Sequence, residues 1–185
     1  MDLRYPIGEF KYSRPLTSEE RSACISNIEQ TPARVRNAVA GLTNEQLDTA
    51  YRPGGWTIRQ VVHHIPESHL NAYIRMKLAT TEELPTIKPY FEDRWAQLED
   101  ARKAPIAMSL DLLDALHQRW IWFLQTLTEP DYERAFNHPE GGAVFRVYLP
   151  AGYASAGALR FGIRRLVGTS ALDHRPSLFA GRRAH

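Results

Sequence analysis

Cysteine is nearly absent from this sequence, with Cys24 the single example among 185 residues. One thiol cannot form an internal disulfide, which excludes a disulfide-stapled fold and agrees with a reducing compartment. Apolar runs of the roughly 20 residues needed to cross a bilayer are also missing. The opening MDLRYPIGEF lacks the cationic and apolar stretches of a secretory signal. We therefore expect a cytoplasmic protein without a membrane partner.

Several catalytic motifs are missing as well. The sequence contains no GxSxG, HExxH, GxGxxG, CxxC or P-loop pattern. The sequence therefore gives no support for assigning the protein to the nucleophile-elbow hydrolases, the zincins, the nucleotide-binding proteins or the dithiol redox proteins. What the chain does contain is ordinary for a globular protein, with 43% hydrophobic and 24% charged residues. Its length suits one domain with a substantial core.

Positive charge is concentrated at one end of the chain. The net charge is +2, but residues 151–185 hold six arginines and a single acid, Asp173. Such a segment is attracted to anionic surfaces. It lacks the regular interleaving of basic and aromatic residues that nucleic-acid sites show. Nucleic acid is therefore not the partner we expect.

Helical spacing of apolar residues recurs along the first three quarters of the chain. Hydroxyl and acidic residues from Thr17 predict a helix to Ala40, with a kink or break at Pro32. Thr57 is the predicted cap of a second long helix, and Ser109 of a third. Shorter elements are expected after Thr43 (helical turn), over 93–102 (helix), from Thr128 (helical turn) and over 137–142 (loop). No alternating pattern predicts a strand, so the expected fold is an all-α antiparallel helix bundle.

Three histidines lie within seven positions of the second predicted helix, GGWTIRQVVHHIPESHLNAYIRM. On a helical wheel His64 lies on a polar flank beside the apolar stripe, next to Ser68, Asn71 and Arg75. Helix bundles direct ligands inward between helices from such positions. Pro66 is expected to bend the helix at this cluster. A metal ligand and a hydrogen-bonded packing residue are both compatible with the position of His64.

The other histidines favour structural or solvated roles. His63 shares its face with Glu67 and is expected to meet water or a partner chain, whereas His69 lies in the apolar stripe as a packing residue. His117 is expected to be solvated or at an interface, and His138 to order a loop. No two of the seven histidines are three or four residues apart, the spacing that places two ligands on one helical face. A metal with about three protein ligands would need other segments.

Several stretches resemble a known family. They are YPIGEF, GGWTIRQVVHHIPESHLNAYIRMKLATTEELPTIKPY, W-x-x-L-x-D-A-R, LH-x-RW and F-x-HPE. Together they resemble the YfiT-like metal-dependent hydrolases of the DinB superfamily over residues 3–146. The resemblance implies a four-helix bundle, usually a homodimer, with one divalent metal such as zinc or nickel held by three histidines. It implies a small-molecule substrate, and relatives include thiol S-transferases.

The resemblance makes His64, the second histidine of the HH pair, the first metal ligand. Glu67, Ser68, Asn71 and Arg75 are candidates for supporting or substrate contacts. The family's other two ligands come from an HxxxH pair on the last helix, which this sequence lacks.

The sequence departs from the family pattern near Val147. We expect a helical domain over 1–146 and an atypical basic segment over 147–185, in which the fourth helix is missing or altered. Alanine, glycine and arginine supply 18 of the last 35 residues, as an out-of-frame reading of GC-rich DNA would. A frameshift is the resulting hypothesis, and an HxxxH segment in neither alternative frame would contradict it.

Two functions follow from these patterns. The first is a metal-dependent hydrolase or thiol S-transferase with His64 as a ligand. The second is a non-catalytic helical bundle that dimerises or binds a partner through its apolar faces.

Overall fold

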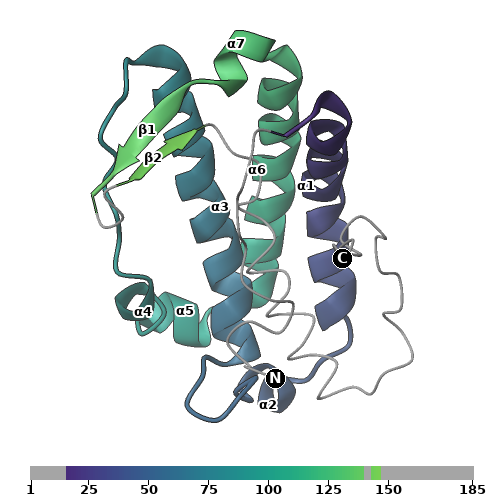
Figure 1. Cartoon of the computed structure of the whole chain (residues 1–185). Helices are drawn as coiled ribbons and strands as arrows, with labels where there is room; N and C mark the ends of the chain where they lie inside the picture. The colour runs from purple at the N-terminus through teal and green to yellow at the C-terminus, as the bar shows by residue number, and fades with distance from the viewer. Residues whose placement is uncertain (1–15, 140–142, 147–185) are drawn as a thin grey trace, which may run out of the picture.

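The computed structural model describes residues 16–139 and 143–146. Three long helices dominate this part of the chain, namely α1 (Ser18–Val39), α3 (Ile58–Thr81) and α6 (Ile106–Thr126), and they stand side by side (Figure 1). The predicted all-α bundle is confirmed. The basic segment 147–185 and its proposed frameshift lie outside the described residues.

The predicted caps explain where two of the long helices begin. Thr17 accepts a hydrogen bond from the Glu20 backbone N–H, and the Glu20 side chain bonds back to the Thr17 N–H. Thr57 and Gln60 form the same reciprocal pair at the start of α3. Each pair satisfies two N–H groups that the helix itself cannot satisfy.

The third long helix begins earlier than predicted. Ser109 is not its cap, because α6 starts at Ile106 directly after Pro105. The Ser109 hydroxyl lies 2.7 Å from His63 Nδ1 instead. Pro32 does not divide its helix into two segments, because α1 continues through it, and α3 likewise continues through Pro66. Both prolines are buried, so their rings pack inside the bundle although each lacks the N–H that a helix interior normally uses.

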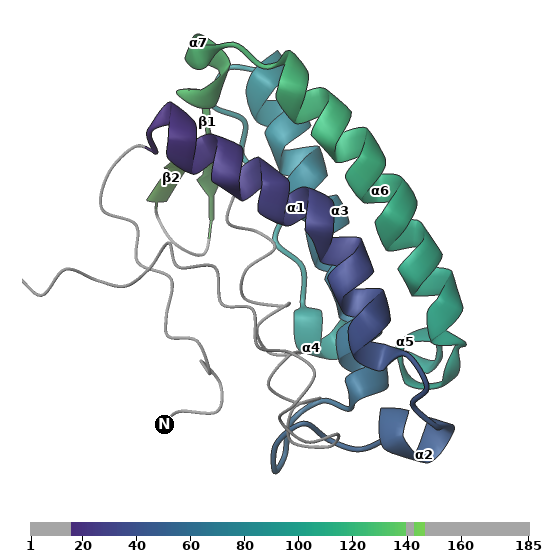
Figure 2. The same cartoon turned by 90° about the vertical axis from the view of Figure 1, so that its right-hand side faces the viewer.

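The long helices do not simply alternate in direction. α1 runs antiparallel to both α3 and α6, whereas α3 and α6 run the same way (Figure 1; Figure 2 shows α1 lying along α6). The contacts agree, because successive α3 residues His63, His69 and Met76 meet successive α6 residues Ser109, His117 and Trp120. A return segment between α3 and α6 makes this parallel arrangement possible.

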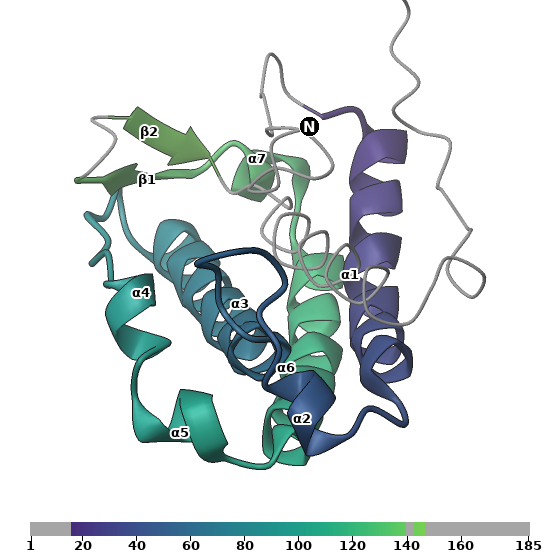
Figure 3. The ribbon, with the colours of Figure 1, turned by 90° about the horizontal axis from the view of Figure 1, so that it is seen from below.

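The return segment carries two short helices, α4 (Glu92–Trp95) and α5 (Glu99–Lys103), where one helical piece was predicted. Viewed from below, both lie beside the first half of α3, with α2 (Asn44–Leu47) at the base of the bundle (Figure 3). α7 (Glu129–Tyr132) follows α6. Of the short helices, α4 and α5 cover the end of α3 that carries the histidine cluster, whereas α7 lies at the opposite end of the bundle (Figure 1).

A two-stranded antiparallel hairpin, β1 (Ala135–His138) and β2 (Ala143–Arg146), contradicts the expectation of no strands. Four-residue strands are too short to show a readable alternation in sequence. Backbone bonds to the return segment stabilise β1: Asn137 N–H donates to Pro85 O, and Ile87 N–H donates to Asn137 O. These tertiary contacts decided the conformation.

Two hydrophobic clusters fill the bundle. The first lies between the start of α3 and the facing ends of α1 and α6, around Ile58, Ile65 and Leu113. The second lies further along, around Ile28, Met76 and the fully buried Trp120. No helix of the described part is long and apolar enough to cross a membrane.

Candidate functional site

His64 lies on α3 at the face that the short helix α4 covers. Its residue exposure is 8%, and the Trp56 ring meets the imidazole edge-on with centroids 4.8 Å apart. Trp56 is itself positioned, because its Nε1–H donates to Asp93 Oδ1 at 3.2 Å. The imidazole is therefore oriented by an aromatic ring that α4 holds in place.

The environment of His64 keeps its imidazole neutral. Burial lowers the pKa of His64 from 6.5 to about 4, and the negative charge of Asp93 only partly opposes this shift. Within the described residues Nδ1 is buried without a hydrogen-bond partner. The other nitrogen, Nε2, lies 4.0 Å from Glu92 Oε2. A neutral imidazole offers a lone pair, which is the form that binds a metal ion.

Tyr90, in the segment before α4, was not identified as a site residue from the sequence. Burial raises the pKa of its phenol to about 12, and Glu92 contributes to the rise. Glu67 acts in the same direction, whereas Ser68 and Arg75 oppose it. The hydroxyl is buried, and among the described residues it has no hydrogen-bond partner of ordinary geometry. Three of the four predicted supporting residues thus lie close enough to Tyr90 to influence its ionisation.

The only sequence signal for Tyr90 was its place at the end of the family-like stretch, in LPTIKPY. Of the predicted residues, Glu67 is partly buried, and this burial together with Asp100 raises the pKa of its carboxyl. Asn71 is less available, because its amide donates to the Glu67 carbonyl of the same helix at 2.9 Å. Glu67, Ser68 and Arg75 therefore remain candidates for contacts at this site.

Replacing Tyr90 with phenylalanine is expected to leave the free energy of unfolding unchanged or to raise it by about 1 kcal/mol. The change removes a buried hydroxyl that has no hydrogen-bond partner of ordinary geometry among the described residues, so no strong hydrogen bond to them is lost. Tyr132→Phe is the matched control, because the Tyr132 hydroxyl donates to Leu124 O at 2.8 Å and its loss should cost about 1 kcal/mol. Urea unfolding measures both, and equal destabilisation by the two variants would contradict the assignment.

The structure corrects the predictions for two other histidines. His63 is 6% exposed rather than solvated, with Nε2 donating to Ala104 O at 3.1 Å and Nδ1 facing Ser109. His117 is 2% exposed rather than at the surface, and its Nδ1 donates to Ile28 O at 2.6 Å. The α5 to α6 connection covers His63, and α1 covers His117. Neither contact is visible from a wheel of one helix.

His69 is a packing residue, as predicted. It is fully buried, and its Nδ1 donates to His117 Nε2 at 2.7 Å. The direction of this bond follows from the neighbouring one, because His117 uses its N–H for Ile28 and has only a lone pair left for His69. The pair belongs to the hydrogen-bonded core between α1, α3 and α6.

A complete metal site does not form within residues 16–139 and 143–146. No group of three histidine, cysteine, aspartate or glutamate side chains there is arranged to hold a metal ion. His64 supplies one imidazole, with the Glu92 carboxylate beside it. The described residues therefore do not by themselves supply the roughly three protein ligands of a catalytic zinc site.

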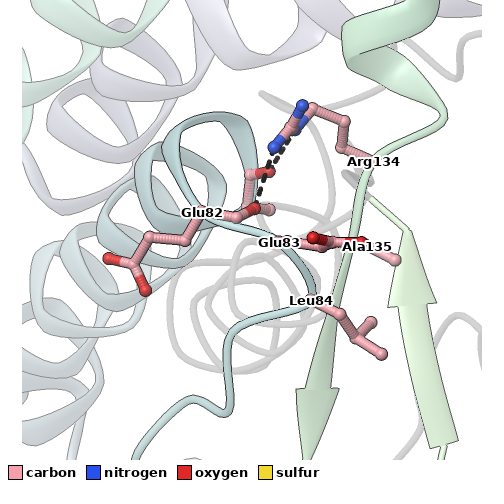
Figure 4. A pocket seen from close by; sticks show the side chains of 6 residues that line it. Glu82, Glu83, Leu84, Arg134 and Ala135 are labelled. Atoms are coloured by element: carbon pink, nitrogen blue, oxygen red, sulfur yellow. Dashed lines mark hydrogen bonds between the residues drawn. The ribbon is translucent and has the colours of Figure 1, made fainter.

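A separate hollow of about 350 Å³ lies at the other end of α3 (Figure 4). Arg134 projects across it and donates to the carbonyl oxygens of Ala79 and Glu82, which caps the last turn of α3. Eighteen residues of helix, roughly 27 Å, separate Glu82 from His64. The hollow is therefore a feature of the helix end and no part of the histidine site.

Comparisons with known proteins agree with this arrangement. The model of the DinB superfamily matches residues 27–153. A protein of Bacillus cereus (strain B4264) is 55% identical over 141 residues, which cover 76% of this chain and 81% of the relative. One of Bacillus thuringiensis subsp. konkukian (strain 97-27) is 54% identical over the same shares. Both carry the name "Putative metal-dependent hydrolase".

A solved structure has the same fold. YfiT from Bacillus subtilis superposes with a TM-score of 0.84 and 40% sequence identity, covering 92% of this chain and 100% of YfiT. It is described as a "probable metal-dependent hydrolase with an unusual four-helix bundle topology". The family model spans well over half of the sequence and the relatives exceed 50% identity, so this chain belongs to the DinB superfamily.

Proposed function

We propose that this protein is a metal-dependent hydrolase in which His64 is one ligand of a divalent cation such as zinc or nickel. The observation that carries the proposal is the state of the His64 side chain. It is buried and neutral at pH 7, and neither ring nitrogen makes a hydrogen bond within the described residues. Buried polar groups normally have partners, so such an imidazole suits an external ligand. The names of the relatives support the same chemistry.

A bound divalent cation would lower the pKa of a coordinated water or thiol and so supply a nucleophile. The residues described here would prepare the site for it. Trp56 and Asp93 orient the His64 ring. Tyr90 keeps its proton at neutral pH and can donate a hydrogen bond to a carbonyl or similar oxygen of a small-molecule substrate. Hydrolysis and thiol transfer both use these features.

Elemental analysis after exposure to zinc or nickel tests the proposal. The full chain should retain about one metal ion after desalting, and His64→Ala should retain almost none. His63→Gln is the matched control, because both His63 nitrogens are already engaged with Ser109 and Ala104 and it should keep the wild-type metal content. Equal metal content in His64→Ala and the wild type, or none in either, would contradict the proposal.

A non-catalytic bundle that forms a homodimer is the second candidate. Large apolar side chains lie exposed on α6, with Met108 at 66% and Trp122 at 73% exposure. Exposed apolar side chains of this size favour association. The same metal analysis separates the candidates, because a purely structural bundle has no use for a cation at His64.

A further inference from the structure

The His64 imidazole and the Glu92 carboxylate face each other across a gap. His64 Nε2 and Glu92 Oε2 lie 4.0 Å apart, which is too far for a hydrogen bond. A lone-pair donor and an anionic oxygen thus lie near each other without a direct bond.

The acid next to Glu92 has a different role. Asp93 accepts the Trp56 Nε1–H and so fixes the aromatic ring against His64. Glu92 is the α4 carboxylate that approaches the imidazole itself. Its side chain is 55% exposed, while that of His64 is 10% exposed. The carboxylate therefore lies largely at the surface, whereas the imidazole is enclosed by the protein.

The gap is slightly wider than the one that a shared tetrahedral cation requires. Zinc binds histidine nitrogen at about 2.0–2.1 Å and carboxylate oxygen at about 2.0–2.2 Å. One ion can therefore reach both atoms across 4.0 Å. A tetrahedral angle at the ion would bring the two atoms to about 3.4 Å. Glu92 needs to move by less than about 1 Å, which its exposure permits.

We propose that Glu92 is a metal ligand and that it binds the same divalent cation as His64. The proposal rests on the metal-dependent function proposed above and extends it to a second residue. Because the sequence has no HxxxH pair, a carboxylate from the return segment would supply part of the ligand set that histidines on one helix cannot. Mixed imidazole and carboxylate ligands suit zinc and related divalent ions.

Zinc affinity of the full chain tests this assignment, measured by competition with a zinc-sensitive dye. Glu92→Gln should weaken zinc binding by about tenfold or more, since even outer-shell changes at metal sites cost about that much. Glu99→Gln is the control, because it removes the same charge from the return segment at a side chain that is 70% exposed and pairs with Lys103. It should stay within about twofold of the wild type. Circular dichroism checks that both variants fold.

The outcomes separate this inference from the proposed function. Wild-type affinity in Glu92→Gln, together with loss of zinc in His64→Ala, would overturn Glu92 as a ligand and leave the proposed function intact. Equal weakening by Glu92→Gln and Glu99→Gln would also overturn it, because general electrostatics would then explain the effect. Absence of zinc binding by the wild-type chain would overturn both.

Discussion

Trp120→Ala is expected to lower the free energy of unfolding by about 4 kcal/mol. Trp120 is completely buried in the second hydrophobic cluster, and its Nε1–H points at Met76 Sδ at 3.2 Å. Its ring also packs edge-on against Tyr73, His69 and His117. Truncation removes these contacts and leaves a cavity where α1, α3 and α6 meet.

Trp122→Ala provides a control on the same helix. Trp122 is 73% exposed, so its removal should change stability by no more than about 0.5 kcal/mol. Urea unfolding followed by circular dichroism measures both variants. A loss below about 1.5 kcal/mol for Trp120→Ala, or similar losses for both tryptophans, would show that the core is not organised around Trp120.

Acidification from pH 7.5 to 5 is expected to destabilise the metal-free protein, with about 2 kcal/mol arising from His64 alone. Burial lowers the pKa of His64 from 6.5 to about 4 and also lowers the pKa values of His63 and His117. Between those pKa values the unfolded chain binds more protons than the folded chain. The contribution of neutral His64 to folding stability is therefore complete above pH 6.5, and it is lost progressively as the pH falls toward 4.

Glu67 acts in the opposite direction, because burial raises the pKa of its carboxyl and protonation relieves that cost. Protonation of Glu67 should offset part of the stability that the histidines lose, but only near pH 5. Urea unfolding at several pH values, with a chelator present, measures the sum. His117→Gln should lose less stability between pH 7.5 and 5 than the wild type does, since glutamine does not titrate. A flat profile over this range would contradict the expected linkage.

Helices were predictable because their signals are local. The Thr17 and Thr57 caps depend on residues three positions apart, and the apolar stripes depend on the helical period. The same local geometry placed His64 on the flank of α3. The hairpin β1–β2 was not predictable, because bonds from the distant residues Pro85 and Ile87 stabilise its first strand.

By itself the sequence determined the family, the three long helices and the choice of His64 over its neighbour as the candidate ligand. Tertiary structure alone decided the rest. It buried His63 and His117, placed Tyr90 near the predicted supporting residues, and brought Glu92 to 4.0 Å from His64 across 28 positions of sequence. Helical periodicity carries information over a few residues, whereas a site between α3 and its return segment depends on how distant parts of the chain pack.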